Sequence, residues 1–246
     1  MDGYDMTTYG KLWAPFYDEL YSDLEGSVID LLARHAGDPP RALELGIGTG
    51  RIALPLRDKG VAVEGIEISE PMLAKMRAKP GGEAIPVTMG DFKEVPIEGT
   101  FPLIYLAFNT IFGLLTQEDQ VQCFRNVADH LEPGGRFIID CFVPDLTRFD
   151  SFNTRMAVSS IESVEEHTYE MSIYDPVQQR VSTHVVRSVG GEAVTLPVEI
   201  RFSWPSELDL MARVAGLVLE DRFGWYDLRP FNARSTSHMS IYRKPE

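Results

Sequence analysis

The chain has 246 residues, of which 44% are hydrophobic and 24% are charged. This length and composition are typical of one globular α/β domain, with room for a small inserted subdomain, and give no indication of disorder. The formal net charge is −14, which repels phosphate backbones and anionic lipid headgroups. We therefore expect a small-molecule ligand, with neither a nucleic acid nor a membrane surface as partner.

Cysteine usage and the N-terminus bear on the compartment. Cys123 and Cys141 are the two cysteines, and they lack CxxC spacing and a nearby histidine, so we expect neither a zinc site nor a disulfide. The start of the chain, Met1–Asp5, lacks the basic residues and apolar run of a secretory signal. No stretch reaches the roughly eighteen apolar residues that a membrane span needs. A cytoplasmic location is the default expectation.

Strand-like and helix-like stretches alternate through the first 145 residues. Such alternation predicts a mostly parallel sheet with helices on both faces. The helix over 70–78 has a sequence signature at its start, since Ser69 can cap it and Pro71 lies in its first turn. The predicted strands cover 41–45, 61–66, 84–89, 101–108 and 136–142, and the other predicted helices cover 49–59 and 118–131.

The pattern changes after about residue 145. Short β-prone runs, for example 169–174 and 181–189, are divided by turn residues and predict an antiparallel meander. A helix over 205–215 and strands over 217–223 and 238–243 then resume the α/β pattern. We expect the meander to be an insertion between the fifth strand and the last helix.

A glycine-rich turn, Glu44–Gly50, directly follows the first predicted strand. Its glycines let the backbone turn tightly and approach a ligand closely. Glu67 ends the second strand about twenty residues further on, where an acidic side chain can bind ribose hydroxyls. NAD(P)-dependent oxidoreductases share both features, but their motif has Gly or Ala where this chain has Arg51. A dinucleotide site is therefore the weaker alternative.

Four motifs follow one another along the chain: Glu44–Gly50, Glu67 with Ser69–Leu73, Gly90-Asp91-Phe92, and Leu131–Gly135. In this order they resemble the motifs of the class I S-adenosylmethionine-dependent methyltransferases, and the resemblance covers nearly the whole chain. The resemblance implies a Rossmann-like, seven-stranded, mostly parallel sheet with helices on both faces, plus an inserted antiparallel β lid, and S-adenosyl-L-methionine as cofactor. It also implies N-terminal lid helices over 1–36, a cofactor-binding domain over 37–145 and 204–246, and an insertion over 146–203 that covers the acceptor.

The same resemblance assigns cofactor contacts to individual residues. Carboxylates accept hydrogen bonds from hydroxyl and amino groups, and a thioether packs well on an aromatic ring. Read alone, Glu44 is also a possible helix-dipole partner, Asp91 a turn residue and Met72 an ordinary core residue. The implied contacts are Glu44 with Gly46, Gly48 and Gly50 at the methionine end, Glu67 at the ribose hydroxyls, Met72 on one face of the adenine, and Asp91 with the Phe92 backbone at the adenine edge.

Asn109 follows the fourth predicted strand, and ligands of open α/β sheets bind outside the carboxyl ends of strands. We therefore expect it to face the sulfonium region of the cofactor. The alternative is a turn or helix N-cap residue, because asparagine is favoured in both.

Tyr9, Trp13, Tyr17 and Tyr21 recur at four-residue intervals, which predicts one aromatic helical face. Such a helix either closes over a ligand or packs on the domain. The segment Phe16–Tyr21 resembles the lid helix of small-molecule methyltransferases, including the sugar N-methyltransferases of antibiotic biosynthesis, in which a tyrosine contacts the methionine end. The resemblance thereby implicates Tyr17 in cofactor binding, and it implies a homodimer through the β insertion.

Methyl transfer is an in-line displacement on an activated sulfonium, so positioning and exclusion of water can supply much of the acceleration. Where the acceptor must lose a proton, a histidine or carboxylate can take it, and the candidates are His130, Asp140 and Tyr226. His130 can instead cap its helix and Asp140 can be an ordinary strand-end carboxylate. We expect N- or O-methylation of a small molecule, such as a secondary-metabolite intermediate, without a metal; a non-catalytic binding protein of the same fold is the third possibility.

Overall fold

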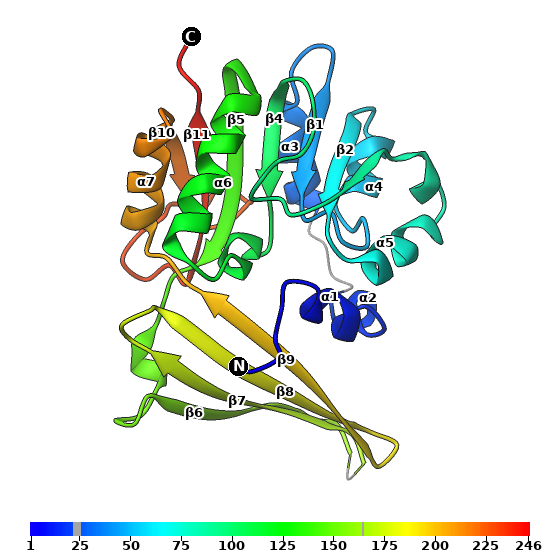
Figure 1. Ribbon diagram of the computed structural model, residues 1–246, viewed down its shortest axis with the longest axis vertical. Coiled ribbons are helices and arrows are strands. Elements are labelled where there is room, and N and C mark those ends of the chain that lie inside the picture. The colour runs from blue at the N-terminus through cyan, green and yellow to red at the C-terminus, as the bar shows by residue number, and fades with distance from the viewer. Residues whose placement is uncertain (22–25, 164) are drawn as a thin grey trace.

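The computed structural model describes residues 1–21, 26–163 and 165–246 and contains two β-sheets, one below the other in Figure 1. In the upper sheet the strands lie in the order β10-β11-β5-β4-β1-β2-β3, and only β11 runs antiparallel to its neighbours. The predicted seven-stranded, mostly parallel sheet is confirmed. Its strands are β1 (Arg41–Leu45), β2 (Ala62–Glu67), β3 (Val87–Met89), β4 (Phe101–Leu106), β5 (Leu131–Phe142), β10 (Val218–Phe223) and β11 (Ser237–Arg243).

Helices cover both faces of this sheet, because successive strand residues point to opposite sides and both sides are apolar. In β4, Ile104 packs toward α6 and α7, while Tyr105 packs in the cluster formed with α3, α4 and α5. None of the described helices is long and apolar enough to cross a membrane. The helices are α3 (Gly26–His35), α4 (Ala53–Asp58), α5 (Glu70–Arg77), α6 (Gln117–His130) and α7 (Pro205–Val214), with 3-10 turns η1 (Gly82–Ala84), η2 (Thr110–Gly113) and η3 (Leu146–Arg148).

The strand order reverses between β1 and β4, since the chain runs outward from β1 to β3 and then returns to the other side of β1. The carboxyl ends of β1, β2, β4 and β5 meet at one edge, which faces the lower sheet in Figure 1. In open α/β sheets the crevice at such a switch point is where ligands bind.

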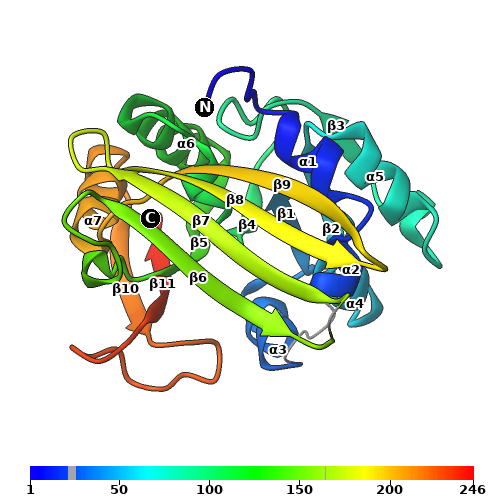
Figure 2. The same ribbon diagram turned by 90° about the horizontal axis from the view of Figure 1, so that it is seen from below.

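The lower sheet is the predicted antiparallel insertion. Its four strands form a simple meander, β6-β7-β8-β9, that lies across the carboxyl edge of the upper sheet (Figures 1 and 2). Its inner face, which includes Leu196 and Val185, packs against Trp13 and Met72. The strands are β6 (Thr154–Ile161), β7 (His167–Asp175), β8 (Arg180–Val189) and β9 (Glu192–Arg201).

The aromatic N-terminal segment forms two short helices, α1 (Thr8–Trp13) and α2 (Tyr17–Leu20), so the prediction of one continuous helical face is wrong. Pro15 lies between them, and a proline inside a helix lacks the N–H donor and clashes with the preceding turn. The aromatic rings of the two helices nevertheless lie close to one another. The ring centroids of Tyr9 and Trp13 are 5.2 Å apart, those of Tyr17 and Tyr21 are 4.9 Å apart, and those of Trp13 and Tyr21 are 6.3 Å apart.

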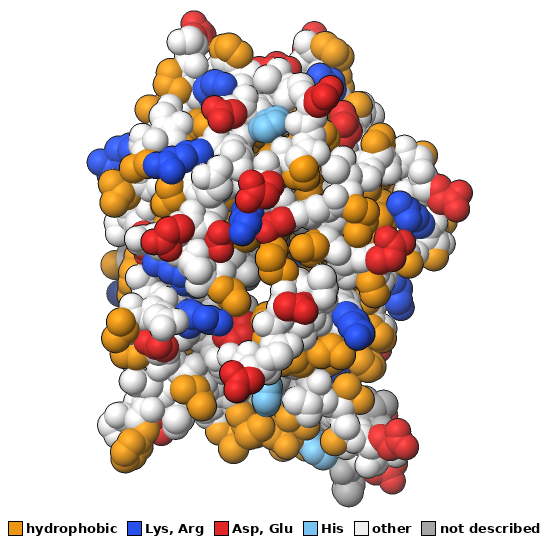
Figure 3. All heavy atoms as spheres, in the orientation of Figure 1, with side chains coloured by type: hydrophobic (Ala, Val, Ile, Leu, Met, Phe, Trp, Pro, Cys, Tyr) orange, Lys and Arg blue, Asp and Glu red, His pale blue; other side chains and the backbone are white. Residues whose placement is uncertain are grey.

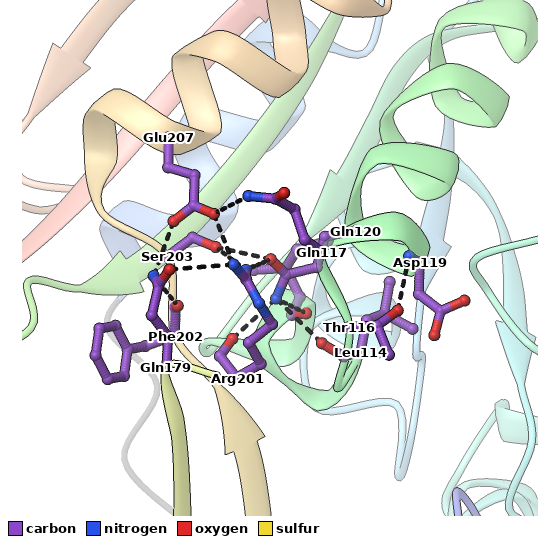
Figure 4. Close-up of polar contacts among 11 residues, drawn as sticks. Leu114, Thr116, Gln117, Asp119, Gln120, Gln179, Arg201, Phe202, Ser203 and Glu207 are labelled. Carbon is purple, nitrogen blue, oxygen red and sulfur yellow. Dashed lines mark hydrogen bonds and ion pairs between the residues drawn. The ribbon is translucent and has the colours of Figure 1, made fainter. Parts of the chain in front are cut away.

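A buried polar network joins the end of β9 to α6 and α7 (Figure 4). The Arg201 guanidinium donates to Gln120 Oε1 at 2.6 Å, to Ser203 Oγ at 2.8 Å and to Glu207 Oε1 at 2.7 Å. Gln120 in turn donates to the carbonyl oxygens of Arg201 and Leu114. Both terminal nitrogens of Arg201 and the side-chain amide of Gln120 thereby have hydrogen-bond partners, and the network fixes where the lower sheet leaves the upper domain.

We predict that Arg201→Ala lowers the free energy of unfolding by about 3 kcal/mol, because the substitution removes the buried guanidinium from the network and leaves the partly buried carboxylate of Glu207 without its cation. Chemical denaturation measures this change. Arg77→Ala is the matched control, since the side chains of Arg77 and Glu70 form an exposed ion pair and should contribute less than about 1 kcal/mol. Equal unfolding midpoints for the two variants would show that the network does not stabilise the fold.

Candidate active site

The glycine loop leaves β1 at the switch point and is fastened to β2. The N–H groups of Gly46 and Ile47 both donate to the carbonyl of Ile66, at 2.9 and 3.0 Å. Gly46, Gly48 and Gly50 have φ angles of 68°, 56° and 74°, which glycine adopts without strain. A Cβ on Gly46 or Gly50 would lie within 3 Å of a neighbouring side chain, whereas a Cβ on Gly48 would meet nothing closer than 3.8 Å. The backbone at Gly48 is therefore open to a ligand.

Glu67 is the last residue of β2, and its carboxylate is hydrogen-bonded to this loop. Its carboxylate accepts hydrogen bonds from the N–H groups of Gly48 (2.8 Å), Ile68 (3.0 Å) and Ser69 (2.7 Å). Burial raises the pKa of Glu67, and the backbone donors oppose that shift. The carboxylate thus joins the glycine loop to the start of α5, and Oε2, which accepts only from Gly48, keeps lone-pair capacity for a ligand hydroxyl.

Glu44 and Arg51 place a buried carboxyl group and a guanidinium group beside the loop. Burial raises the pKa of Glu44 to about 8, while the hydroxyl of Tyr105, which donates at 2.8 Å, and the charge of Arg51 act in the opposite direction. The guanidinium carbon of Arg51 lies 3.6 Å from the centroid of the Phe108 ring. A buried carboxyl group and a stacked guanidinium together match the ammonium and carboxylate of an amino acid.

The N-terminal helices are tied directly to the glycine loop. Asp18 in α2 accepts from the hydroxyl of Thr49 at 2.6 Å and from the ammonium of Lys79 at 2.9 Å, and Lys79 also donates to the Thr49 carbonyl at 2.8 Å. Burial raises the pKa of Tyr17 to about 12, against the opposing charge of Arg51. The aromatic segment is thus held over the loop, with Tyr17 beside Arg51.

The residues predicted at the adenine lie around the same edge. Asp91 follows β3 and accepts from the N–H of Lys93 at 3.0 Å; burial raises its pKa. Phe92 lies against the loop, since a Cβ on Gly46 would be 3.8 Å from its ring. Met72 is buried at the start of α5, where it packs with Trp13 and the lower sheet. The structure therefore brings Asp91 and Phe92 to the loop, and places Met72 beneath α1.

Asn109 and Asp140 meet where β4 and β5 end. Phe108 and Asn109 have positive φ angles of 57° and 61°, an uncommon pair for residues with side chains. The carboxylate of Asp140 accepts from the N–H of Phe108 at 3.0 Å, and the side-chain oxygen of Asn109 accepts from the N–H of Phe142 at 2.6 Å. Both side chains hold the strained turn that presents Phe108 to Arg51, as functional turns often require.

The three proton-acceptor candidates do not form one group. Tyr226 donates to Asp140 at 2.5 Å, and both side chains are buried. Burial raises the pKa of Asp140 to about 6, which the hydrogen bond from Tyr226 opposes. His130 lies at the opposite end of the sheet, at the start of β5, with its ring nitrogens 2.7 Å from the Asn126 carbonyl and 2.9 Å from the Ile97 carbonyl. The structure thus separates His130 from the other predicted site residues.

Sequence reasoning missed Arg51, Asp18 and Lys79 as parts of the site. In the sequence, Arg51 stands out as the residue that replaces Gly or Ala of the dinucleotide motif. Its charge and its place directly after the glycine loop also point to contact with a ligand. Asp18 lies inside the aromatic segment, and Lys79 lies just beyond α5. Among residues 1–21, 26–163 and 165–246, no three His, Cys, Asp or Glu side chains are grouped as a metal site would require.

An open glycine loop, a buried carboxylate at the end of β2 and a switch point covered by a second sheet are typical of α/β folds that bind nucleotides and nucleosides. The family model described as a methyltransferase domain matches residues 42–135. The chain is 36% identical to the CcbJ methyltransferase of Streptomyces caelestis, with a TM-score of 0.87 and coverage of 99% of this chain and 100% of that one. It is also 26% identical to a cypemycin N-terminal methyltransferase from Streptomyces sp over 98% of this chain and 99% of the relative.

A third comparison shows the shared fold. The S-adenosylmethionine-bound CalS10 of Micromonospora echinaspora, an amino pentose methyltransferase, has a TM-score of 0.62 at 18% identity, over 98% of this chain and 92% of that one. The chain belongs to the class I S-adenosylmethionine-dependent methyltransferases. S-adenosylmethionine is its cofactor, and the expected class and cofactor are confirmed.

Proposed function

We propose that the enzyme transfers a methyl group to the nitrogen of a small amine in secondary metabolism. The observation that carries this proposal is the aromatic cluster of α1 and α2, which the Asp18–Thr49 hydrogen bond fastens over the glycine loop. Aromatic faces attract ammonium and sulfonium groups. The full-length similarity to a methyltransferase named for an N-terminal acceptor supports nitrogen over oxygen.

The donor contacts of the proposal follow the geometry of the loop. Glu44 would bind the ammonium of the methionine moiety, losing its proton as it does so, and Arg51, beside Tyr17, would bind the carboxylate. Glu67 would accept the ribose hydroxyls, and Asp91 with Phe92 would lie at the adenine. When bound, S-adenosylmethionine supplies an activated methyl group on a sulfonium.

An amine acceptor also agrees with the hydrogen bonding of the buried carboxyl groups. The carboxylates of Glu44, Glu67 and Asp140 all have hydrogen-bond donors within the described chain. A neutral amine has a nucleophilic lone pair and needs no base at the moment of attack, unlike a weakly acidic hydroxyl. We assign Asp140 and Tyr226 the task of holding the Phe108 turn, so that orientation and exclusion of water are the main contributions of the chain.

We further propose that the enzyme forms a homodimer through the outer face of the lower sheet. Hydrophobic side chains gather there, at the foot of Figure 3, and β6 is an unpaired edge strand. Met156, Val158 and Ile173 are 72%, 64% and 62% exposed. An apolar patch beside an open edge is typical of a surface that another chain covers.

Calorimetric titration tests the donor site. We predict micromolar binding of S-adenosylhomocysteine and no binding of NAD or NADP. Glu67→Ala and Asp91→Ala should each weaken binding by about 1–3 kcal/mol, because ligand donors lose their acceptor. Glu64→Ala is the control on the same strand, since its carboxylate pairs with Arg41 instead. Wild-type affinity in Glu67→Ala would refute its assignment, and dinucleotide binding would refute the donor site.

The affinity for S-adenosylhomocysteine should rise from pH 6 toward about pH 8. Glu44, with a pKa of about 8, holds a proton in the donor-free enzyme, and the ligand ammonium lowers that pKa, so binding releases a proton below pH 8. Titrations at pH 7 in buffers of different ionisation enthalpy count the released protons. Glu44→Gln should release none from this position, and an unchanged proton count in that variant would contradict the assignment.

Sedimentation equilibrium tests the homodimer. Ile173→Glu places a charge on the outer face of the lower sheet and should convert a dimer into a monomer, since an unpaired charge buried in an interface is costly. Val177→Glu is the control, because Val177 is 89% exposed in the turn after β7 and lies off the sheet. A monomeric wild-type protein, or a dimer in both variants, would exclude this interface.

A further inference from the structure

A cavity of about 780 Å³ lies between the inner face of the lower sheet and the end of β5. Its size is that of a small-molecule site. Apolar walls come from Phe142, Val181 and Ile200, and hydroxyl groups come from Ser172 and Thr183, which are hydrogen-bonded to each other at 2.9 Å. The charged residues of its wall are Arg148, Arg155, Arg234, Asp145 and Glu170.

One end of this cavity adjoins the donor site. Phe142 lines the cavity, and its N–H donates to Asn109 at the end of β4. Glu170 lies close enough to Tyr21 for its charge to contribute to the raised pKa of that phenol, whose main cause is burial. Tyr21 in turn accepts from Arg51 through its carbonyl, at 3.2 Å. Phe142 thus connects the cavity to Asn109 at the donor site.

The cations of the cavity are not all neutralised by the chain. Arg155 pairs with Glu170 at 2.6 Å, and both side chains are largely buried. Arg148 and Arg234 are exposed, and among the described residues neither guanidinium has a hydrogen bond or salt bridge. Asp145 affects Arg148 only through its charge, because its Oδ1 accepts from the N–H and hydroxyl of Thr147.

The guanidinium groups of Arg148 and Arg234, unpaired among the described residues, line this cavity in a chain whose formal net charge is −14. Arginine binds carboxylate and phosphate oxygens through paired N–H donors, and a local positive wall draws such ligands into a cleft of an otherwise acidic protein. These two guanidinium groups, in a cavity that adjoins the donor site, match an acceptor that carries an anionic group.

We propose that the acceptor is an amine that also carries an anionic oxygen group, a carboxylate or a phosphate, which Arg148 and Arg234 bind in the cavity beside the donor site. This inference rests on the proposed N-methyltransferase function and adds the substrate class. Binding of the anionic group by the two arginines orients the acceptor, so that its nitrogen is directed at the donor site.

Binding of simple anions tests the arginine end. The full-length enzyme, saturated with S-adenosylhomocysteine, is titrated with succinate or inorganic phosphate at constant ionic strength, and the thermal midpoint is recorded. We expect a saturable rise for at least one anion, with the stronger one identifying the group. The half-saturating concentration should increase at least tenfold in the Arg148→Ala/Arg234→Ala double variant and stay unchanged in Arg77→Ala. Equal responses in all three proteins overturn the proposal.

Turnover of matched dipeptides tests orientation. Alanyl-alanine and its C-terminal amide offer the same amine with and without the carboxylate. We expect kcat/KM at least tenfold higher for the acid, and a ratio near one in the double variant. A wild-type enzyme that prefers the amide overturns the proposal; where neither dipeptide reacts, the anion titration decides it. Loss of S-adenosylhomocysteine binding would refute the proposed function itself, whereas intact binding without an anion response refutes only the substrate class.

Discussion

The site depends on one buried interaction, the hydrogen bonds that three backbone N–H groups donate to the carboxylate of Glu67. They join the glycine loop, the end of β2 and the start of α5 in one rigid unit. An uncompensated carboxylate at this depth would be costly, and the backbone donors reduce that cost. Because α1 packs on the same end of α5, where Gly10 leaves no space for a Cβ beside Ser69, the position of the lid also follows from this unit.

Buried acids are a recurring feature of the switch point. Burial raises the pKa values of Glu44, Glu67 and Asp140, so each carboxyl group is held in a state that a hydrogen-bond donor or a cation can stabilise further. Arg51 is a cation that the chain itself provides at this edge, and it stacks on Phe108. A cationic donor therefore complements a site whose charges remain incompletely compensated within the protein.

The sequence was sufficient to predict the upper sheet, because glycine spacing, strand-end acids and apolar strands are local signals. The predicted helix over 49–59 begins earlier than α4, because the positive φ angles of Gly46, Gly48 and Gly50 delay the start of the helix until Ala53. Side-chain partners such as Arg51 with Phe108, or Asp18 with Lys79, join residues far apart along the chain and have no local signature. The break at Pro15 did have one, and the four-residue aromatic spacing obscured it.

The acceptor cavity lies between two sheets, so its shape depends on how firmly they are joined. The Arg201 network sets the direction in which β9 leaves the upper domain, and through Gln120 it also holds the carbonyls of Ile111 and Leu114 around η2. η2 follows the strained Phe108 turn beside the donor site. The same side chains thus position one wall of the cavity and the segment next to the donor, so a loosened junction would disturb both substrates' positions together.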